Sequence, residues 1–174
     1  TSGQAALDQL KNMSLKSFFH IGPPRDFDLF KTFESQKTEK IDVSDFLLCT
    51  GLFDEYQIDL KFYEKLLLDH TKKKMICTNP DLIVDRGNIR EFCAGTIAKI
   101  FEKLGGDVKY FGKPYPEVYE KAFNNLKGKK VICIGDNLNT DIKGANIQNF
   151  DSLLISNGIH KNEISNGIKE LTKK

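Results

Sequence analysis

Apolar positions recur along the chain with two alternating periods. Short apolar runs closed by loops are typical of buried strands, and apolar residues three and four positions apart are typical of helices. The predicted strands are residues 17–21, 45–50, 75–78, 108–111, 131–134 and 152–155. The predicted helices are residues 5–10, 60–69, 89–104, 116–126 and one ending near 145, with a polar helical stretch around 27–33. Strands that alternate with helices predict parallel α/β layers, and the second half has the order of a doubly wound sheet.

The length of the chain allows one ordinary domain or two small ones. Its 174 residues are 40% hydrophobic and include 13 Phe, enough for a sizeable core. The softest boundaries lie near Asn12 and near Gly105 to Asp107, so we expect a separate α/β domain between them. The chain opens with Thr1-Ser2-Gly3, a plausible helix cap without an initiator Met, and we expect the polypeptide to begin further upstream.

The composition argues against several classes of protein. The 26 basic and 24 acidic residues are spread along the chain, which gives no field of one sign for nucleic acid. The four cysteines form neither a CxxC pair nor a zinc cluster, and the three histidines occur singly. No apolar stretch reaches the roughly 20 residues of a membrane span. We therefore expect a cytoplasmic protein with no nucleic-acid partner and no membrane partner.

The strongest chemical signal is an acidic loop after an apolar strand. The strand of residues 131–134 leads through Gly135 to Asp136, and Asp141 follows near the start of the next helix. Ligands of open α/β sheets bind at the carboxyl ends of the strands, where two carboxylates can hold a hard cation. The alternative is that both acids merely cap the helix that follows.

A second signal is Gly112-Lys113-Pro114, directly after the strand of residues 108–111. Pro114 keeps Lys113 out of helical geometry, so the ammonium group should stay at the sheet edge. One helix and one strand separate Lys113 from Asp136, and a right-handed crossover would place both at the ends of neighbouring parallel strands. An ammonium group beside a bound cation suits phosphoryl transfer, although a lone loop lysine is more often a solvated charge.

Several segments together resemble one known family. GKPYPEVYEKAF, then VICIGDNLNTDIKGA, then DSLLISNGIH are similar to the third and fourth motifs of haloacid-dehalogenase phosphatases of the class IIA branch, NagD-like or 4-nitrophenylphosphatase-like. TSGQAAL, MICTNPD and GTIAKIFEKLGG resemble that branch's α/β cap and the segment leading into it. The resemblance covers essentially the whole chain. It implies that residues 1–14 are a core segment, residues 15–106 an inserted α/β cap domain, and residues 107–174 the C-terminal half of a doubly wound, Rossmann-like core.

The resemblance also implies roles for particular residues. Asp136 would be a ligand of Mg²⁺, Asp141 would support the metal site or orient Lys113, and Lys113 would neutralise the nucleophile and the phosphate. Asn79 and Asp81, from the TNPD segment, would face the active site from the cap and help to choose the leaving group. A turn of Asn, Pro and Asp also needs no substrate to explain it.

One departure from the family is clear. Members carry a DxDG motif, with the nucleophile, ahead of the point where this sequence starts. Asp26 and Asp28 have the DxD spacing but follow Gly22-Pro23-Pro24-Arg25 instead of a buried strand, so we reject them as catalytic residues. We expect the nucleophile to lie upstream and the chain alone to be inactive.

These observations lead to one expected function. The chain should be part of a Mg²⁺-dependent hydrolase that cleaves a small phosphorylated metabolite through an aspartyl-phosphate. A cap of the expected size offers surface for a homodimer. The alternative is a non-catalytic relative that keeps the fold as a binding or regulatory module. A nucleotide-binding α/β protein lacks support, because the sequence has neither GxGxxG nor a P-loop.

Overall fold

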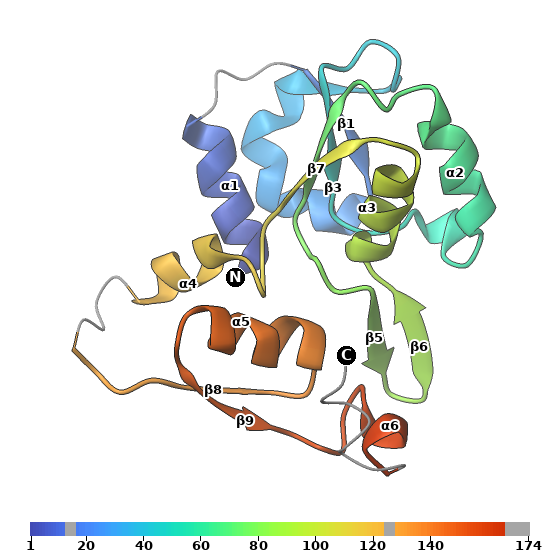
Figure 1. The fold of residues 1–174 in the computed structure, drawn as a ribbon. Helices are drawn as coiled ribbons and strands as arrows, with labels where there is room; N and C mark the ends of the chain where they lie inside the picture. Colours follow the sequence, from blue (N-terminus) through green and yellow to red (C-terminus); the bar gives the residue numbers. More distant parts are fainter. Residues whose placement is uncertain (13–16, 124–127, 166–174) are drawn as a thin grey trace. The chain divides into compact units, whose positions relative to one another are not determined.

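The computed structural model describes residues 1–12, 17–123 and 128–165 (Figure 1). The chain divides after Gly112 into two compact units. The first unit holds the whole of the predicted cap, and the second holds the acidic loop of Asp136 and Asp141. The division falls six residues beyond the predicted boundary at Gly106, so the cap and the core as functional domains stay predictions.

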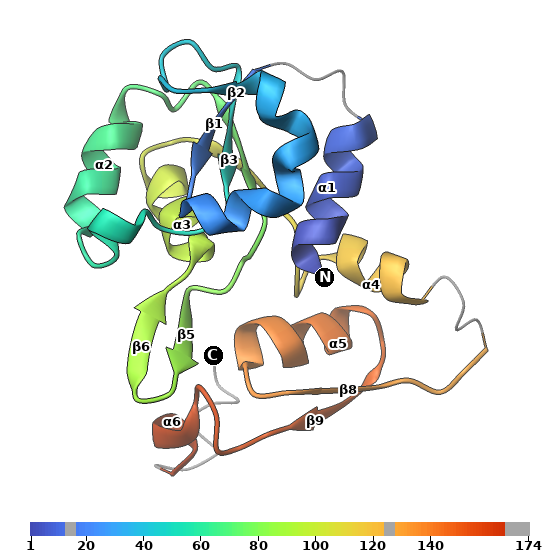
Figure 2. The same ribbon diagram turned by 180° about the vertical axis from the view of Figure 1, so that it is seen from behind.

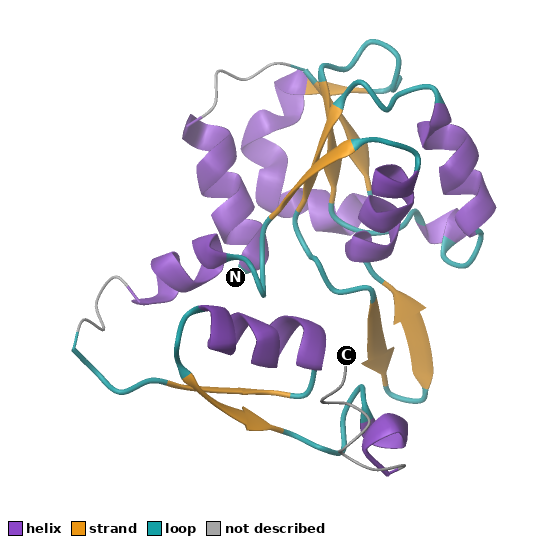
Figure 3. Ribbon diagram, viewed as in Figure 1, coloured by secondary structure: helices purple, strands orange, loops and turns teal. Residues whose placement is uncertain are grey.

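The first unit is built on a parallel five-stranded sheet with the order β2-β1-β3-β4-β7. The strands are β1 (Phe18–Ile21), β2 (Lys37–Thr38), β3 (Phe46–Cys49), β4 (Lys74–Cys77) and β7 (Asp107–Tyr110). Figure 3 shows them side by side in the middle of the unit. All six strands predicted from apolar runs are confirmed, four of them in this sheet and two in the second unit.

Helices cover both faces of this sheet (Figures 1 and 2). α1 (Ser2–Asn12) and the 3₁₀ helix η1 (Pro24–Gln36) lie on one face, and α2 (Leu60–Leu68) and α3 (Ala94–Lys103) lie on the other, with the short η2 (Asp54–Tyr56) before α2. Apolar side chains of α1 and η1 form one buried cluster with strand residues, including Leu10, Phe30, Phe18 and Leu48. Of the predicted core segment 1–14, residues 1–12 pack onto the sheet of the first unit, and residues 13 and 14 lie outside the described residues.

The predicted helix of residues 89–104 is wrong over its first turn. Residues 83–92 form an antiparallel hairpin of β5 (Ile83–Arg86) and β6 (Ile89–Phe92), and α3 begins only at Ala94. Gly87 opens the two-residue turn with φ of 63°, a left-handed conformation that glycine adopts without strain. The turn signal Gly87-Asn88 thus outweighed the helical spacing that follows it.

The second unit carries a parallel two-stranded sheet of β8 (Ile132–Gly135) and β9 (Asp151–Leu154). α4 (Pro116–Phe123) precedes β8, the π-helical turn η3 (Leu138–Ile142) and α5 (Lys143–Ile147) connect the strands, and α6 (Lys161–Ser165) follows. The predicted helix of residues 116–126 is confirmed to Phe123, and its end lies outside the described residues. The α/β class and the doubly wound order predicted from the sequence are confirmed.

One expected strand pairing is wrong. The sequence suggested that the strand before Lys113 and the strand before Asp136 are neighbours. Instead β7 pairs with β4, while β8 pairs with β9. The five-stranded sheet of the first unit gains an edge strand from residues assigned to the core.

Two further expectations concern cysteines and membranes. All four cysteines, expected to form neither a CxxC pair nor a zinc cluster, are free thiols; Cys49 and Cys77 are buried, whereas Cys93 and Cys133 are half-buried. Within the described part of the chain, no helix combines the length and the apolar character that crossing a membrane requires.

Candidate functional site

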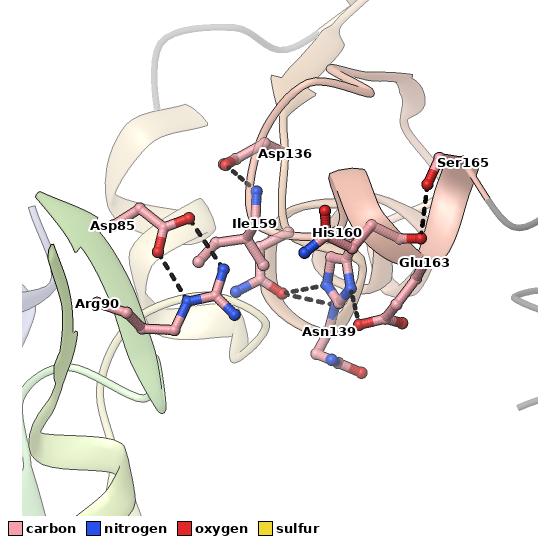
Figure 4. Close-up of polar contacts among 10 residues, drawn as sticks. Asp85, Arg90, Asp136, Asn139, Ile159, His160, Glu163 and Ser165 are labelled. Atoms are coloured by element: carbon pink, nitrogen blue, oxygen red, sulfur yellow. Dashed lines mark hydrogen bonds and ion pairs between the residues drawn. The ribbon is translucent and has the colours of Figure 1, made fainter. Parts of the chain in front are cut away.

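Asp136 lies at the carboxyl end of a strand, as predicted. β8 ends at Gly135, and the next residue presents its carboxylate to the loop that follows β9. There the backbone N–H of Ile159 donates a hydrogen bond of 3.0 Å to Oδ2 of Asp136 (Figure 4). A Cβ on Gly158 would lie 2.2 Å from the same oxygen, so only glycine lets this loop approach the carboxylate so closely.

Asp141 is almost fully buried and holds Lys113. Its Oδ1 accepts a hydrogen bond of 2.5 Å from Nζ of Lys113, and its Oδ2 accepts one of 3.1 Å from the backbone N–H of Asn137. The carboxyl group of Asp141 lies against Gly135, where a Cβ would come within 2.2 Å of Cγ. Asp141 is 8% exposed, while the Lys113 side chain is 47% exposed. One side of the ammonium group is therefore fixed by a carboxylate, and another side is open.

Packing between helices brings Lys113 to Asp141. Lys113 and Pro114, joined by a cis peptide bond, precede α4, and Tyr119 of α4 packs against Gly144 of α5. A Cβ on Gly144 would lie 2.0 Å from the Tyr119 hydroxyl and 3.1 Å from Cα of Pro114. This close approach ties the Lys113 segment to the turn that carries Asp141. This packing of helices brings Lys113 to Asp141, where the sequence had suggested a pairing of neighbouring strands.

The alternative role for Asp136 and Asp141 was to cap the helix that follows them, but another residue caps that helix. Asn137 occupies the N-cap position of η3, and its side chain accepts a hydrogen bond from the backbone N–H of Asn139. Asp141 lies within η3 and points back to Asn137 and Lys113. Asp136 precedes the cap and contacts a different loop. The two acids thus have contacts that a capping role alone does not explain.

The oxygen donors of this loop suit a divalent cation in kind. Oδ2 of Asp136 accepts the bond from Ile159, whereas Oδ1 accepts none from the described residues. Mg²⁺ prefers carboxylate oxygens and keeps several water ligands. In the part of the chain that the structure describes, no three His, Cys, Asp or Glu side chains gather into a metal site. The loop offers one carboxylate for a cation and leaves the other ligand positions to water or to groups from elsewhere.

His160 is a residue of this loop that sequence reasoning missed. It is 8% exposed, its Nδ1 lies 3.1 Å from Oε1 of Glu163, and its Nε2 lies 3.5 Å from Oδ1 of Asn137 (Figure 4). The ring therefore links the start of α6 to the residue that follows Asp136. Only the spacing of His160 and Glu163 at the start of a helix hinted at this, because Asn137 is far away in sequence.

Asn79 and Asp81 lie in the first unit, where they line a cavity of about 450 Å³. They belong to the loop after β4, in which Oδ1 of Asn79 accepts a hydrogen bond of 3.2 Å from the backbone N–H of Asp81. This Asx turn is held against the start of α3, because a Cβ on Gly95 would lie 2.2 Å from the Pro80 carbonyl oxygen. The turn is therefore structural in itself, and it also presents two polar side chains to a cavity.

The β5–β6 hairpin forms a wall of this cavity. Cross-strand partners share a face, and the pairs Val84 with Glu91 and Arg86 with Ile89 both line the cavity. Other lining residues come from the first turn of η1 and from the loop after β3: Arg25, Asp26, Thr50 and Leu52. The sequence analysis missed this wall because it assigned residues 89–92 to a helix. The alternation of Val84, Arg86, Ile89 and Glu91 around Gly87 was the available signal.

The acidic side chains of the cavity affect a nearby thiol. Cys93, at the N-cap of α3, lines the cavity and is half-buried. Partial burial raises the pKa of Cys93 to about 11, and Asp81 and Glu91 add to the increase while Arg86 opposes it. The thiol at this wall is therefore protonated at neutral pH.

Comparison with known proteins matches most of the second unit to a family model and nearly the whole chain to a solved structure. The family model described as HAD-hydrolase-like matches residues 110–171, which include Lys113, Asp136 and Asp141. The crystal structure of a hydrolase of the haloacid dehalogenase-like family from Brucella suis superposes with a TM-score of 0.80 at 32% identity, over 92% of this chain and 64% of that one. Residues 110–171 of this chain thus match the haloacid-dehalogenase-like hydrolases, and nearly the whole chain resembles a solved member of that family.

Curated relatives of this chain carry phosphatase names. It is similar to a dihydroxyacetone phosphatase of Corynebacterium glutamicum, 29% identical over 89 residues, which are 49% of this chain and 32% of the relative. It is also similar to a 4-nitrophenylphosphatase of Schizosaccharomyces pombe, 42% identical over 62 residues, 34% of this chain and 21% of the relative. The predicted family and its nitrophenylphosphatase-like branch are confirmed. The chain spans between a fifth and a third of these two relatives.

Proposed function

We propose that this chain belongs to a magnesium-dependent hydrolase of small phosphomonoesters. One observation carries the proposal. The buried carboxylate of Asp141 holds the ammonium group of Lys113, and Asp141 follows closely on Asp136, which lies at the end of β8. A fixed ammonium group beside a carboxylate with a free oxygen is the arrangement that stabilises a transferring phosphoryl group. The names of the two curated relatives support an ester of a small molecule.

The proposed reaction has two steps. A carboxylate from a segment preceding Thr1 attacks phosphorus, the bond between phosphorus and the alcohol oxygen breaks, and that oxygen takes a proton from solvent as the alcohol leaves. Water then attacks the aspartyl-phosphate, which restores the carboxylate and releases inorganic phosphate. Lys113 offsets the negative charge of the phosphoryl oxygens in both steps.

The other residues of the second unit position these groups. Asp141 orients Lys113 through the 2.5 Å contact, and its second oxygen holds the backbone of Asn137. Asp136 would hold the magnesium ion, and Ile159 keeps the carboxylate turned toward that role. A bound divalent cation would supply further charge to the phosphoryl oxygens. The account therefore assigns Asp136 to the cation and Lys113 to the phosphate.

The first unit would act as the cap. Its cavity, lined by Asn79 and Asp81, would receive the leaving group, and the second unit would act on the phosphoryl group. This division predicts that changes at Asn79 or Asp81 alter the ranking of substrates more than the hydrolysis of a small aryl phosphate.

The test is hydrolysis of 4-nitrophenyl phosphate by the full-length polypeptide in the presence of magnesium. Lys113→Ala should lower kcat by roughly two to four orders of magnitude, because it removes one preorganised charge from the site. Lys109→Ala is the matched control, since Lys109 is exposed in β7 and its Nζ lies 5.2 Å from the Phe111 ring centroid. That control should keep near-normal kcat. If Lys113→Ala does so too, the proposed site is wrong and the non-catalytic binding module becomes the better account.

A further inference from the structure

The segment that follows β9 is anchored by one buried side chain, and that side chain is polar. Among residues 151–165 only His160 is buried, and α6 contributes no buried residue of its own. A buried imidazole is costly unless its ring nitrogens find partners, so those partners set the position of the ring. The segment is therefore held by directional contacts rather than by an apolar core.

The two ring nitrogens of His160 face two acceptor groups (Figure 4). Nδ1 lies 3.1 Å from Oε1 of Glu163 in α6, and because a carboxylate only accepts hydrogen bonds, Nδ1 is the nitrogen that donates. Nε2 lies 3.5 Å from Oδ1 of Asn137, an oxygen that also accepts a bond of 2.9 Å from the backbone N–H of Asn139. The shorter contact, with a carboxylate, is the one that holds the ring.

A single turn connects this ring to the carboxylate of Asp136. The backbone N–H of Lys161 donates a bond of 3.0 Å to the carbonyl of Gly158, which closes a turn with Ile159 and His160 at its centre. In the same turn, the N–H of Ile159 donates to Oδ2 of Asp136. Neighbouring residues of one closed turn do not move independently. A shift of the His160 ring would therefore displace the N–H that holds Asp136.

We propose that His160 is a positioning residue for the cation at Asp136, and that Glu163 is the group that keeps His160 in place. The pair holds the N–H of Ile159 on Oδ2 of Asp136 and so leaves Oδ1 for the cation. This step rests on the proposed function, in which Asp136 binds magnesium. His160 and Glu163 touch neither substrate nor reacting atoms in this account, so they set the affinity for the cation and not the rate of the saturated enzyme.

Two substitutions of His160 separate the hydrogen bond from the bulk of the ring. His160→Leu keeps an apolar side chain of similar reach without a donor, whereas His160→Asn places a side-chain N–H near the position of Nδ1. In the full-length polypeptide, the magnesium concentration for half-maximal hydrolysis of 4-nitrophenyl phosphate should rise about tenfold in His160→Leu and less than about twofold in His160→Asn. The kcat at saturating magnesium should stay within about twofold of wild type in both. An unchanged requirement in His160→Leu, or the same increase in both variants, would overturn the proposal.

Glu163 tests the same contact from its exposed side. The Glu163 side chain is 53% exposed, so Glu163→Ala threatens the fold least and decides the question alone if His160→Leu does not fold. It should raise the magnesium requirement about as far as His160→Leu, and the double variant should add little, because both changes remove one contact. The matched control is Asn162→Ala, exposed in the same turn of α6, which should behave as wild type. A normal requirement in Glu163→Ala, or additive losses in the double variant, would contradict the pairing.

Two further measurements need no turnover. Mn²⁺, which prefers the same oxygen ligands as Mg²⁺, is titrated into the full-length polypeptide while the free ion is followed by electron paramagnetic resonance. Its dissociation constant should rise in His160→Leu and Glu163→Ala but not in Asn162→Ala.

The second measurement follows the amide of Ile159 in the metal-free polypeptide. Its hydrogen exchange should become faster in His160→Leu and Glu163→Ala, because the bond to Asp136 loosens. Unchanged exchange would overturn the positioning role and leave the phosphatase in place. If the wild type hydrolyses no ester, the proposed function fails, while Mn²⁺ binding and the exchange of Ile159 still decide the role of His160.

Discussion

The two units of this chain contain the same kind of parallel sheet but bury it differently. In the first unit, Leu47, Leu48 and Met75 of the central strands are fully buried between two layers of helices. In the second unit, Ile132 and Ile134 of β8 remain 58% and 61% exposed. Leu153 and Ile155, at and after β9, are also about half exposed. Parallel sheets are normally covered on both faces, so the β8–β9 sheet is bare by comparison.

The chemical groups nevertheless lie in the less buried unit. Lys113, Asp136 and Asp141 are positioned by close approaches at Gly135, Gly144 and Gly158, with a few hydrogen bonds. Such contacts fix geometry locally and contribute little buried apolar area. The comparison teaches that the site residues of the second unit are positioned by local backbone contacts, whereas the strands of the first unit are held by a buried core.

The largest expected effect comes from the core of the first unit. Leu48→Ala should lower the local free energy of unfolding by about 2–5 kcal/mol, because it leaves a cavity in a closely packed layer. Ile134→Ala, on the exposed face of β8, should cost less than about 1 kcal/mol. Amide hydrogen exchange measures both strands in one experiment. Similar losses of protection for the two variants would remove the contrast between the units.

A second prediction concerns the pH dependence of the stability of the first unit. Burial, helped by the charge of Lys37, lowers the pKa of His20 in β1 from 6.5 to about 4. The unfolded chain therefore binds a proton at higher pH than the folded chain does. Stability from this group is complete above pH 6.5 and falls, by up to roughly 3 kcal/mol, as the pH drops toward 4.

The measurement is thermal unfolding of the first unit between pH 7 and 4. Nε2 of His20 hydrogen-bonds Oγ1 of Thr50 at 2.8 Å, and His20→Gln keeps a polar partner there without the titration. The acid-induced drop in the midpoint should be smaller in that variant. An unchanged drop would show that His20 does not link protons to the fold.

Sequence patterns predicted elements that depend on local signals. Apolar runs located the strands of both parallel sheets, and Gly-Asp after an apolar run located Asp136 at a strand end. The hairpin was missed because the helical spacing of Ile97, Ala98 and Phe101 was extended too far toward the N-terminus, past the turn at Gly87.

Contacts between distant segments were harder to predict. From the sequence we expected Lys113 to approach Asp136 because the strands before them, β7 and β8, would be neighbours. Instead β7 pairs with β4, and the packing of Tyr119 on Gly144 brings Lys113 to Asp141. The cavity forms where separate segments of the chain meet, among them those of Asp26, Asn79 and Glu91. A periodic pattern of apolar residues along the sequence does not predict such contacts between distant segments. Tertiary packing decides these positions.

The central claim is that Asp136 serves the cation while Lys113 serves the phosphate, and a magnesium titration of the full-length polypeptide tests it most directly. Steady-state hydrolysis of 4-nitrophenyl phosphate is measured for wild type, Asp136→Asn and Lys113→Ala over a wide range of magnesium concentration. Asp136→Asn should raise the magnesium concentration for half-maximal rate, and excess magnesium should restore part of its activity. Lys113→Ala should stay slow at every concentration. An unchanged magnesium dependence in Asp136→Asn, or recovery of Lys113→Ala by magnesium, would contradict the assignment.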